Sequence, residues 1–235
     1  MHKNCVMLIA LILGPLLSIT GSPQTNAEAI DWDKILNAAH IYFASPTSEN
    51  AFEFYTVLPK TQVRGEARET EFSKVFYYID GNLDVLERQV LKADRNAVKV
   101  AVRLFTISDG AFSEWLDSML GDLIRVDPKM FLEEIREFPW RNNYKDFKEW
   151  LLRRGNQLCN GRILDVESKA SDKTKRKELE LRIIALDTVK DANLADLRDE
   201  CIAIIRKYIA RVFESPRARS RFSPYNRLQI RRIRG

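Results

Sequence analysis

Apolar residues recur at every third or fourth position along most of the chain after residue 30, which is the spacing of one face of an α-helix. Prolines and short polar stretches interrupt this pattern, so it predicts separate helices rather than one long helix. The predicted helices cover residues 31–44, 48–58, 66–79, 82–91, 94–105, 112–126, 128–138, 144–159, 178–189 and 193–213.

Short polar side chains stand in front of several of these helices, where they can accept a hydrogen bond from a backbone N–H of the first turn. Asp31, Asn82 and Asp94 are predicted to cap the helices that come after them. Asp127 precedes Pro128, and proline suits the first helical position because its missing N–H would have no partner there. These local signals mark four helix starts.

The spacing of apolar residues also predicts which face of each helix is buried. In the helix over 48–58 the expected inward residues are Phe52 and Tyr55. Two later helices have longer predicted stripes: Phe112, Trp115, Met119, Leu123 and Val126 in one, and Leu194, Leu197, Cys201, Ile204, Tyr208 and Val212 in the other.

Consecutive short helices with tight connections predict an all-α fold of stacked antiparallel helix pairs. Either an irregular α–α superhelix or an orthogonal helical bundle fits this pattern. Glycine (9) and proline (8) are scarce, which argues against a turn-rich β-sandwich. We predict a main helical domain over 30–161, a charged linker or helix start over 162–177, a helical hairpin over 178–214 and a basic, flexible tail over 215–235.

Residues 94–105 (DRNAVKVAVRLF) carry Asp94, Val98, Ala101 and Leu104 at helical spacing. This segment resembles the second helix of a HEAT repeat. The resemblance covers one helix, and no second copy occurs at a fixed period. It implies an α-solenoid of the HEAT or armadillo kind, in which helix pairs stack to form an extended binding surface.

The first 29 residues have the pattern of a secretion signal. Lys3 supplies a short cationic start, residues 5–17 are uncharged and almost wholly apolar, and Ala27-Glu28-Ala29 has the small-x-small form that signal peptidase recognises. We expect cleavage before Ile30 and a periplasmic or secreted protein. An uncleaved membrane anchor is the competing interpretation, although about 13 apolar residues are few for a bilayer span.

Export affects how the remaining cysteines are interpreted, because disulfides persist in oxidising compartments. Cys159 and Cys201 are the two that lie after the leader, and they are either a disulfide pair or two buried thiols. A metal site built from them is not expected, since His40 is the only histidine after the leader.

The formal net charge of +5 is concentrated in the tail. Residues 215–235 contain seven arginines and no acidic residue, so the rest of the exported chain is close to neutral. Such a segment can bind anionic polymers, which for an exported protein are lipids or wall polymers rather than nucleic acid. The alternative is a solvated, disordered terminus. The binding candidates in the tail are Arg217, Arg219, Arg221, Arg231 and Arg232.

Aromatic residues concentrate between 112 and 150, where they either fill the core or line a groove for a peptide or sugar. Trp140, Arg141, Asn143 and Tyr144 are the least core-like of this region, because they come after a helix-breaking proline and mix rings with polar donors. We predict that a small binding site would include them.

No motif of a known catalytic type is present: there is no phosphate-binding glycine loop, no His-Glu-x-x-His and no nucleophile elbow. We therefore expect a non-enzymatic envelope module that binds a protein, a peptide or an anionic envelope component, without a cofactor. The alternative is an exported, carboxylate-dependent glycan hydrolase, for which the candidate acids are Glu114, Glu133 and Glu134.

Overall fold

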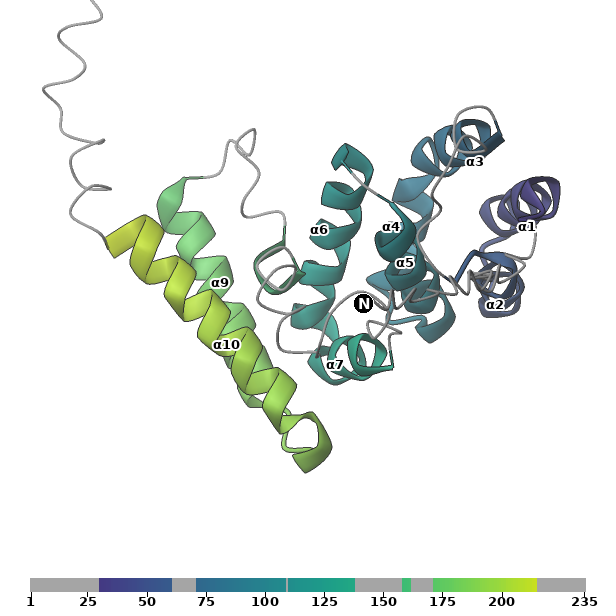
Figure 1. The fold of residues 1–235 in the computed structure, drawn as a ribbon. Coiled ribbons are helices and arrows are strands. Elements are labelled where there is room, and N and C mark those ends of the chain that lie inside the picture. Colours follow the sequence, from purple (N-terminus) through teal and green to yellow (C-terminus); the bar gives the residue numbers. More distant parts are fainter. Residues whose placement is uncertain (1–29, 61–70, 109, 138–157, 162–170, 215–235) are drawn as a thin grey trace, which may run out of the picture. The chain divides into compact units, whose positions relative to one another are not determined.

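The structure, a computed structural model, describes residues 30–60, 71–108, 110–137, 158–161 and 171–214. The described helices belong to the second of the two units of the chain, which begins at Asp31. The α-helices of the second unit are α1 (Trp32–Ala44), α2 (Ser48–Val57), α3 (Glu71–Asp80), α4 (Leu83–Val90), α5 (Arg95–Ile107), α6 (Gly110–Val126), α7 (Pro128–Arg136), α9 (Asp172–Asp187) and α10 (Ala195–Ile209) (Figure 1). A 3-10 turn, η4 (Ala192–Leu194), precedes α10, and a π-helical turn, η5 (Ala210–Glu214), extends it at its C-terminal end.

The predicted all-α fold is confirmed: every regular element among the described residues is helical. Neighbours along the chain pack on each other, as in the pairs α1 with α2, α4 with α5, α6 with α7 and α9 with α10. Packing also joins helices that are further apart in sequence, such as α2 with α5 and α6 with α9. This arrangement is compatible with a helical-repeat-like fold.

Three of the four predicted helix caps are confirmed. Asp31, Asp94 and Asp127 each accept a hydrogen bond of 2.9 Å from the backbone N–H three residues later. Asn82 occupies the N-cap position of α4, but its side chain makes no capping bond and donates instead to the carbonyl of Tyr78. Asn82 therefore stands at the predicted cap position, but its side chain bonds the end of α3 and not the first turn of α4.

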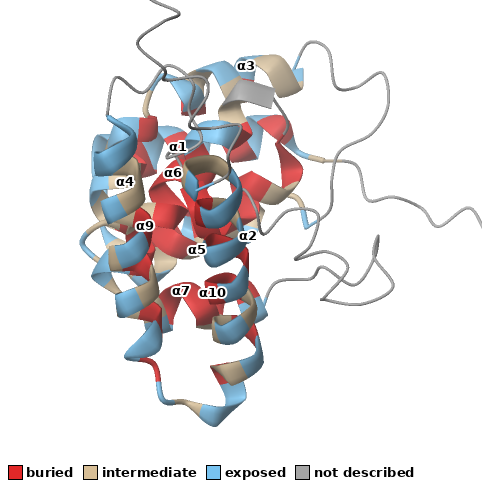
Figure 2. Ribbon diagram, turned by 90° about the vertical axis from the view of Figure 1, so that its left-hand side faces the viewer, coloured by how far each residue is buried: buried red, intermediate tan, exposed pale blue. Residues whose placement is uncertain are grey.

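Helix α5 is the most enclosed of the described helices, because it packs against α2, α4, α6 and α7 (Figure 2). Its small and branched apolar residues allow this close approach on several sides. The buried apolar residues of α5 are Ala97, Val98, Val100, Ala101, Val102, Leu104, Phe105 and Ile107.

The predicted faces of α2 and α6 need correction. In α2, Phe54 and Ala51 are buried, whereas Phe52 is 46% exposed. In α6, Trp115 is 43% exposed and Val126 is 49% exposed. The apolar residues of α6 that are buried are Leu116, Met119, Leu120, Leu123 and Ile124, because α5, α7 and α9 pack on that side of the helix.

The C-terminal hairpin begins earlier than its predicted first helix. Helix α9 starts at Asp172, inside the segment predicted as a charged linker or helix start, and the Ser171 hydroxyl caps it by accepting from the N–H of Thr174. The long helix predicted over 193–213 is instead a 3-10 turn, an α-helix and a π-helical turn in succession.

Arg182 of α9 is fully buried and joins three parts of the chain. Its guanidinium donates to the carbonyl of Asn160 at 2.7 Å and pairs with the Asp122 carboxylate of α6 at 2.7 Å. Two glycines make room for it, because a Cβ atom at Gly121 or Gly161 would lie 2.6 or 2.9 Å from an Arg182 nitrogen. Gly161 also has a φ of +40°, a region that favours glycine.

Beside this junction, Cys159 and Cys201 form a disulfide with an S–S distance of 2.07 Å. The bond connects the short helical segment at 158–161 to α10. The disulfide and the hydrogen bond from Arg182 to the carbonyl of Asn160 therefore hold the same short segment against the C-terminal hairpin.

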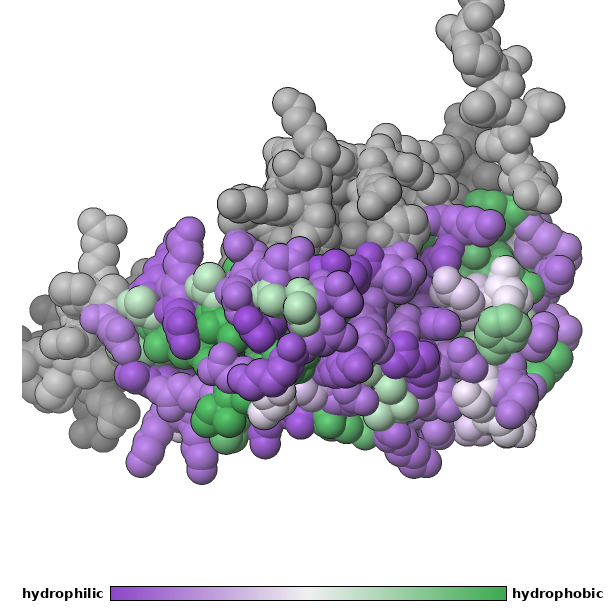
Figure 3. All heavy atoms as spheres, turned by 90° about the horizontal axis from the view of Figure 1, so that it is seen from below, coloured by the Kyte–Doolittle hydropathy of each residue, from purple (hydrophilic) through white to green (hydrophobic). Residues whose placement is uncertain are grey.

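Hydrophilic side chains cover most of the described face in Figure 3, and apolar residues reach that surface in separate places. The large apolar side chains that are exposed are Ile41, Phe52, Tyr77, Trp115, Val126 and Ile184. Among the described helices, none has the length and apolar character needed to cross a bilayer.

Candidate functional site: a charged pocket between α2, α5 and α7

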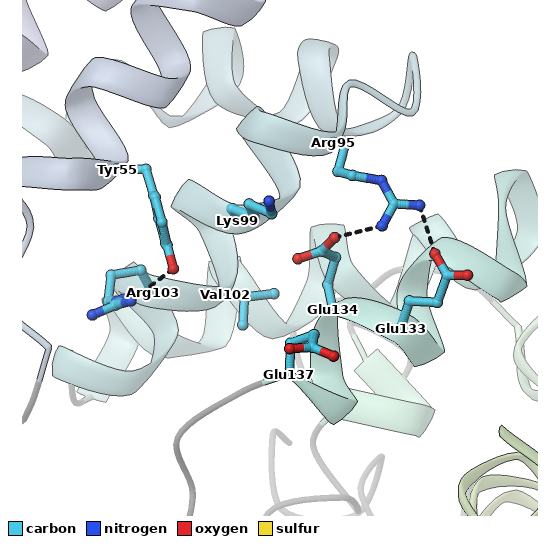
Figure 4. A pocket seen from close by; sticks show the side chains of 8 residues that line it. All are labelled: Tyr55, Arg95, Lys99, Val102, Arg103, Glu133, Glu134 and Glu137. Carbon is cyan, nitrogen blue, oxygen red and sulfur yellow. Dashed lines mark hydrogen bonds and ion pairs between the residues drawn. The ribbon is translucent and has the colours of Figure 1, made fainter. Parts of the chain in front are cut away.

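A pocket of about 590 Å³ opens between helices α2, α5 and α7 (Figure 4). Charged side chains of both signs dominate its walls, together with one aromatic ring and one aliphatic side chain. The lining residues are Tyr55, Arg95, Lys99, Val102, Arg103, Glu133, Glu134 and Glu137.

The charges come from two helices, and helical periodicity explains their arrangement. Residues four apart on a helix lie on the same face, so Arg95, Lys99 and Arg103 form a row of cations along α5. The carboxylates Glu133, Glu134 and Glu137 come from α7 and its C-terminal end. The pocket thus has a cationic wall and an anionic wall.

Arg95 bridges the two walls at one end of the pocket (Figure 4). Its guanidinium contacts Glu133 at 2.5 Å and Glu134 at 2.9 Å, each through a different nitrogen. The hydrogen bond with Glu133 contributes most to raising the pKa of Arg95. Lys129 adds a longer contact of 3.6 Å to Glu133, so this carboxylate is held by two cations.

Glu134 is 5% exposed, which is unusual for a carboxylate. Burial raises its pKa above the ordinary value, while Lys99 and Arg95 act in the opposite direction. The Glu134 carboxyl can therefore hold a proton at a higher pH than an exposed glutamate would.

At the other end, Arg103 and Tyr55 form a second polar group. The Arg103 guanidinium donates to the Tyr55 hydroxyl at 2.8 Å and to the carbonyl of Pro59 at 3.4 Å. Its central carbon lies 4.8 Å from the centroid of the Tyr55 ring, within the range of a cation–π contact.

Two of the three candidate acids meet in this pocket, and the third does not. Glu133 and Glu134 line it together. Glu114 lies on α6, where its charge helps to raise the pKa of buried Asp117. His40, the only histidine after the leader, packs its ring 3.9 Å from the ring of Tyr78.

The remaining predicted binding residues lie outside the described part of the chain. They are the aromatic-polar group Trp140, Arg141, Asn143 and Tyr144, and the tail residues Arg217, Arg219, Arg221, Arg231 and Arg232. Both groups therefore stay predictions.

Sequence reasoning missed five charged or aromatic site residues: Tyr55, Arg95, Lys99, Arg103 and Glu137. A usable signal was present, because three cations stand at four-residue spacing in a helix whose other residues are mostly apolar. The contribution of Tyr55 could not be recognised in that way, since it depends on how α2 packs against α5.

Comparison with protein-family models, with curated proteins and with solved structures finds no significant match. Within the described ranges, no three His, Cys, Asp or Glu side chains are placed to hold a metal ion. The function is therefore inferred from the pocket itself.

Proposed function

We propose that the protein is an exported, non-enzymatic binding module of a bacterial cell envelope, built as a helical repeat of the HEAT or armadillo kind. Its pocket between α2, α5 and α7 holds a polar peptide segment that carries side chains of both charges. The observation that carries this proposal is the facing of a cationic wall from α5 and an anionic wall from α7 across one cavity.

A peptide suits this pocket better than an apolar small molecule. Among the described residues that line the pocket, Val102 is the only one with an aliphatic side chain, so they contribute little hydrophobic binding energy. Charge complementarity then supplies specificity, because a ligand of the wrong sign would bury like charges together. A chain with an acidic and a basic side chain can match both walls at once.

The leader and the tail extend this proposal. The leader would deliver the protein to the periplasm or the exterior. The arginine tail, residues 215–235, would hold the protein at an anionic lipid or wall polymer. Retention of the protein on anionic vesicles should then decrease when residues 215–235 are removed, while peptide binding in the pocket is unchanged.

The pocket proposal is tested by peptide binding with charge-neutral variants. Lys99→Gln and Glu137→Gln each remove one pocket charge, and each should weaken binding of a fluorescent peptide containing aspartate and lysine by about tenfold, or ~1.4 kcal/mol. Lys92→Gln and Glu49→Gln are the matched controls, because both side chains are exposed and outside the pocket. Equal binding by all four variants and the wild type would reject the pocket as the site.

Carboxylate-dependent glycan hydrolysis is the second candidate function, and buried Glu134 is the observation that favours it. A carboxyl with a raised pKa is suited to act as a general acid. The hydrolase proposal requires that the wild type release reducing ends from cell-wall glycan and that Glu134→Gln abolish this release, while Glu114→Gln retains it. Absence of release by the wild type supports the binding module.

A further inference from the structure

Arg103 carries a buried charge that the described residues do not neutralise. It is 8% exposed, and within the described part of the chain its contacts are with the Tyr55 hydroxyl, the Tyr55 ring and the carbonyl of Pro59, all of which are uncharged. Its Nε atom is buried and has no hydrogen-bond partner. Arg95 differs in this respect, because it pairs with two carboxylates.

A buried cation without a counter-charge is costly, since burial removes the water that would otherwise solvate it. Neutral hydrogen-bond acceptors offset only part of that cost. An anion that enters the pocket beside Arg103 would therefore bind with a more favourable free energy than at an exposed arginine. Water screens the charges at an exposed site.

Two further groups lie beside Arg103 and suit an oxyanion. Lys99 is one helical turn away on the same face of α5; its charge acts on Glu134, but no carboxylate in the described part of the chain makes a direct ion pair with it. The Tyr55 oxygen accepts from Arg103, which leaves its own hydroxyl proton free to donate to a ligand. Figure 4 places Tyr55 and Arg103 at the end of the pocket opposite the Arg95 bridge, with Lys99 between them.

We propose that Arg103, Lys99 and Tyr55 form an anion subsite that binds a carboxylate of the peptide, either an acidic side chain or a C-terminus. This inference rests on the proposed peptide-binding function, and it adds the orientation in which the peptide binds. The acidic group of the ligand lies at the α2 and α5 end, and its basic group lies toward Glu137 and Glu134. A guanidinium and a tyrosine hydroxyl together can donate to both oxygens of one carboxylate.

The test compares two blocked tetrapeptides that differ only in having aspartate or asparagine at one end, with lysine at the other. Binding to the purified exported chain is measured by calorimetry at constant ionic strength. The wild type should bind the aspartate peptide about tenfold more tightly than the asparagine peptide, corresponding to ~1.4 kcal/mol. Arg103→Gln should reduce that preference to near one.

Tyr55→Phe keeps the ring and its packing, so it tests the subsite even if Arg103→Gln fails to fold. It should lower the aspartate preference about threefold, while Lys92→Gln should leave it unchanged. An aspartate preference that persists in both pocket variants would overturn the subsite. Inorganic phosphate that binds the wild type more tightly than the aspartate peptide would overturn the assignment to a carboxylate.

The outcomes separate this inference from the proposed function. If the wild type binds both peptides equally, and Glu137→Gln weakens both, the peptide pocket stands and the anion subsite is rejected. If neither peptide binds the wild type, both proposals are rejected.

Discussion

At the residue scale, buried charges are the feature of this protein that depends most on tertiary packing. The aspartate caps could be predicted from sequence because each bonds a backbone group only three residues away. The environments of Arg103 and Glu134 could not be predicted in this way. Each depends on the packing of α5 with α2 or α7, which local spacing does not define.

Asp117 of α6 provides a pH prediction at this scale. Burial, and secondarily the charge of Glu114, raise its pKa from 3.8 to about 7, while Arg182 acts in the opposite direction. Between these two values the folded state binds a proton that the unfolded state does not. The free energy of unfolding should therefore fall as pH rises from about 4 to about 7, by at most ~1.4 kcal/mol per pH unit from this group.

Urea unfolding at several pH values measures this dependence. Asp117→Asn should flatten it and stabilise the protein above pH 7, because the amide carries no charge to be buried. Some slope will remain, since the pKa of Glu134 is also raised. Asp80→Asn, at an exposed position, is the control. If Asp117→Asn leaves the pH dependence of the unfolding free energy unaltered, Asp117 is not the group that causes it.

At the element scale, helix positions were predictable and some helix faces were not. Prolines and caps define the boundaries of α1, α2 and α7 locally, so spacing and breakers located them. Helices α2 and α6 carry apolar residues on more than one side, and the neighbouring helices determine which side is buried. That information is absent from the periodicity of a single helix.

Helix α6 approaches Arg182 so closely that adding one methyl group at Gly121 should destabilise the protein. In Gly121→Ala the new Cβ would lie 2.6 Å from an Arg182 nitrogen and 3.0 Å from the Cα of Gly161. The variant should lose about 2 kcal/mol of stability through overpacking. Thermal unfolding provides the measurement.

Gly81→Ala is the matched control, because its Cβ would meet only backbone oxygens at 3.5 and 3.7 Å, which are ordinary contacts. Its stability should stay within about 0.5 kcal/mol of the wild type. If both variants have the same stability, tight packing around Arg182 does not explain why position 121 requires glycine.

At the scale of the whole molecule, the all-α fold could be predicted from sequence, whereas the pocket could not. Scarce breakers and continuous helical spacing suffice for the fold class, because that class depends on pattern alone. The pocket requires Tyr55, the α5 cations and the α7 acids to be brought together from segments about 80 residues apart. The Cys159–Cys201 pair is an intermediate case. The predicted export made a disulfide one of two interpretations, and the structure contains the bond.

Reduction of this disulfide should lower the melting temperature. The bond closes a loop with a sequence separation of 42, for which the restriction of the unfolded chain contributes roughly 3–4 kcal/mol. For a chain of this size the shift should be about 10 °C, measured by calorimetry with and without a thiol reductant. The Cys159→Ser/Cys201→Ser double variant should melt at the lower temperature in both conditions. An equal melting temperature for wild type and double variant would show that the bond does not contribute.

The buried position of Arg182 bears on whether this protein can be shortened. Repeat arrays usually tolerate the loss of a terminal repeat, because each repeat contacts only its neighbours. Here the hairpin inserts a charged side chain between Gly121 and Gly161, and its removal would leave Asp122 without that partner. Helices α6, α7, α9 and α10 should therefore unfold in one cooperative step, and a chain that ends before α9 should be much less stable than the whole protein.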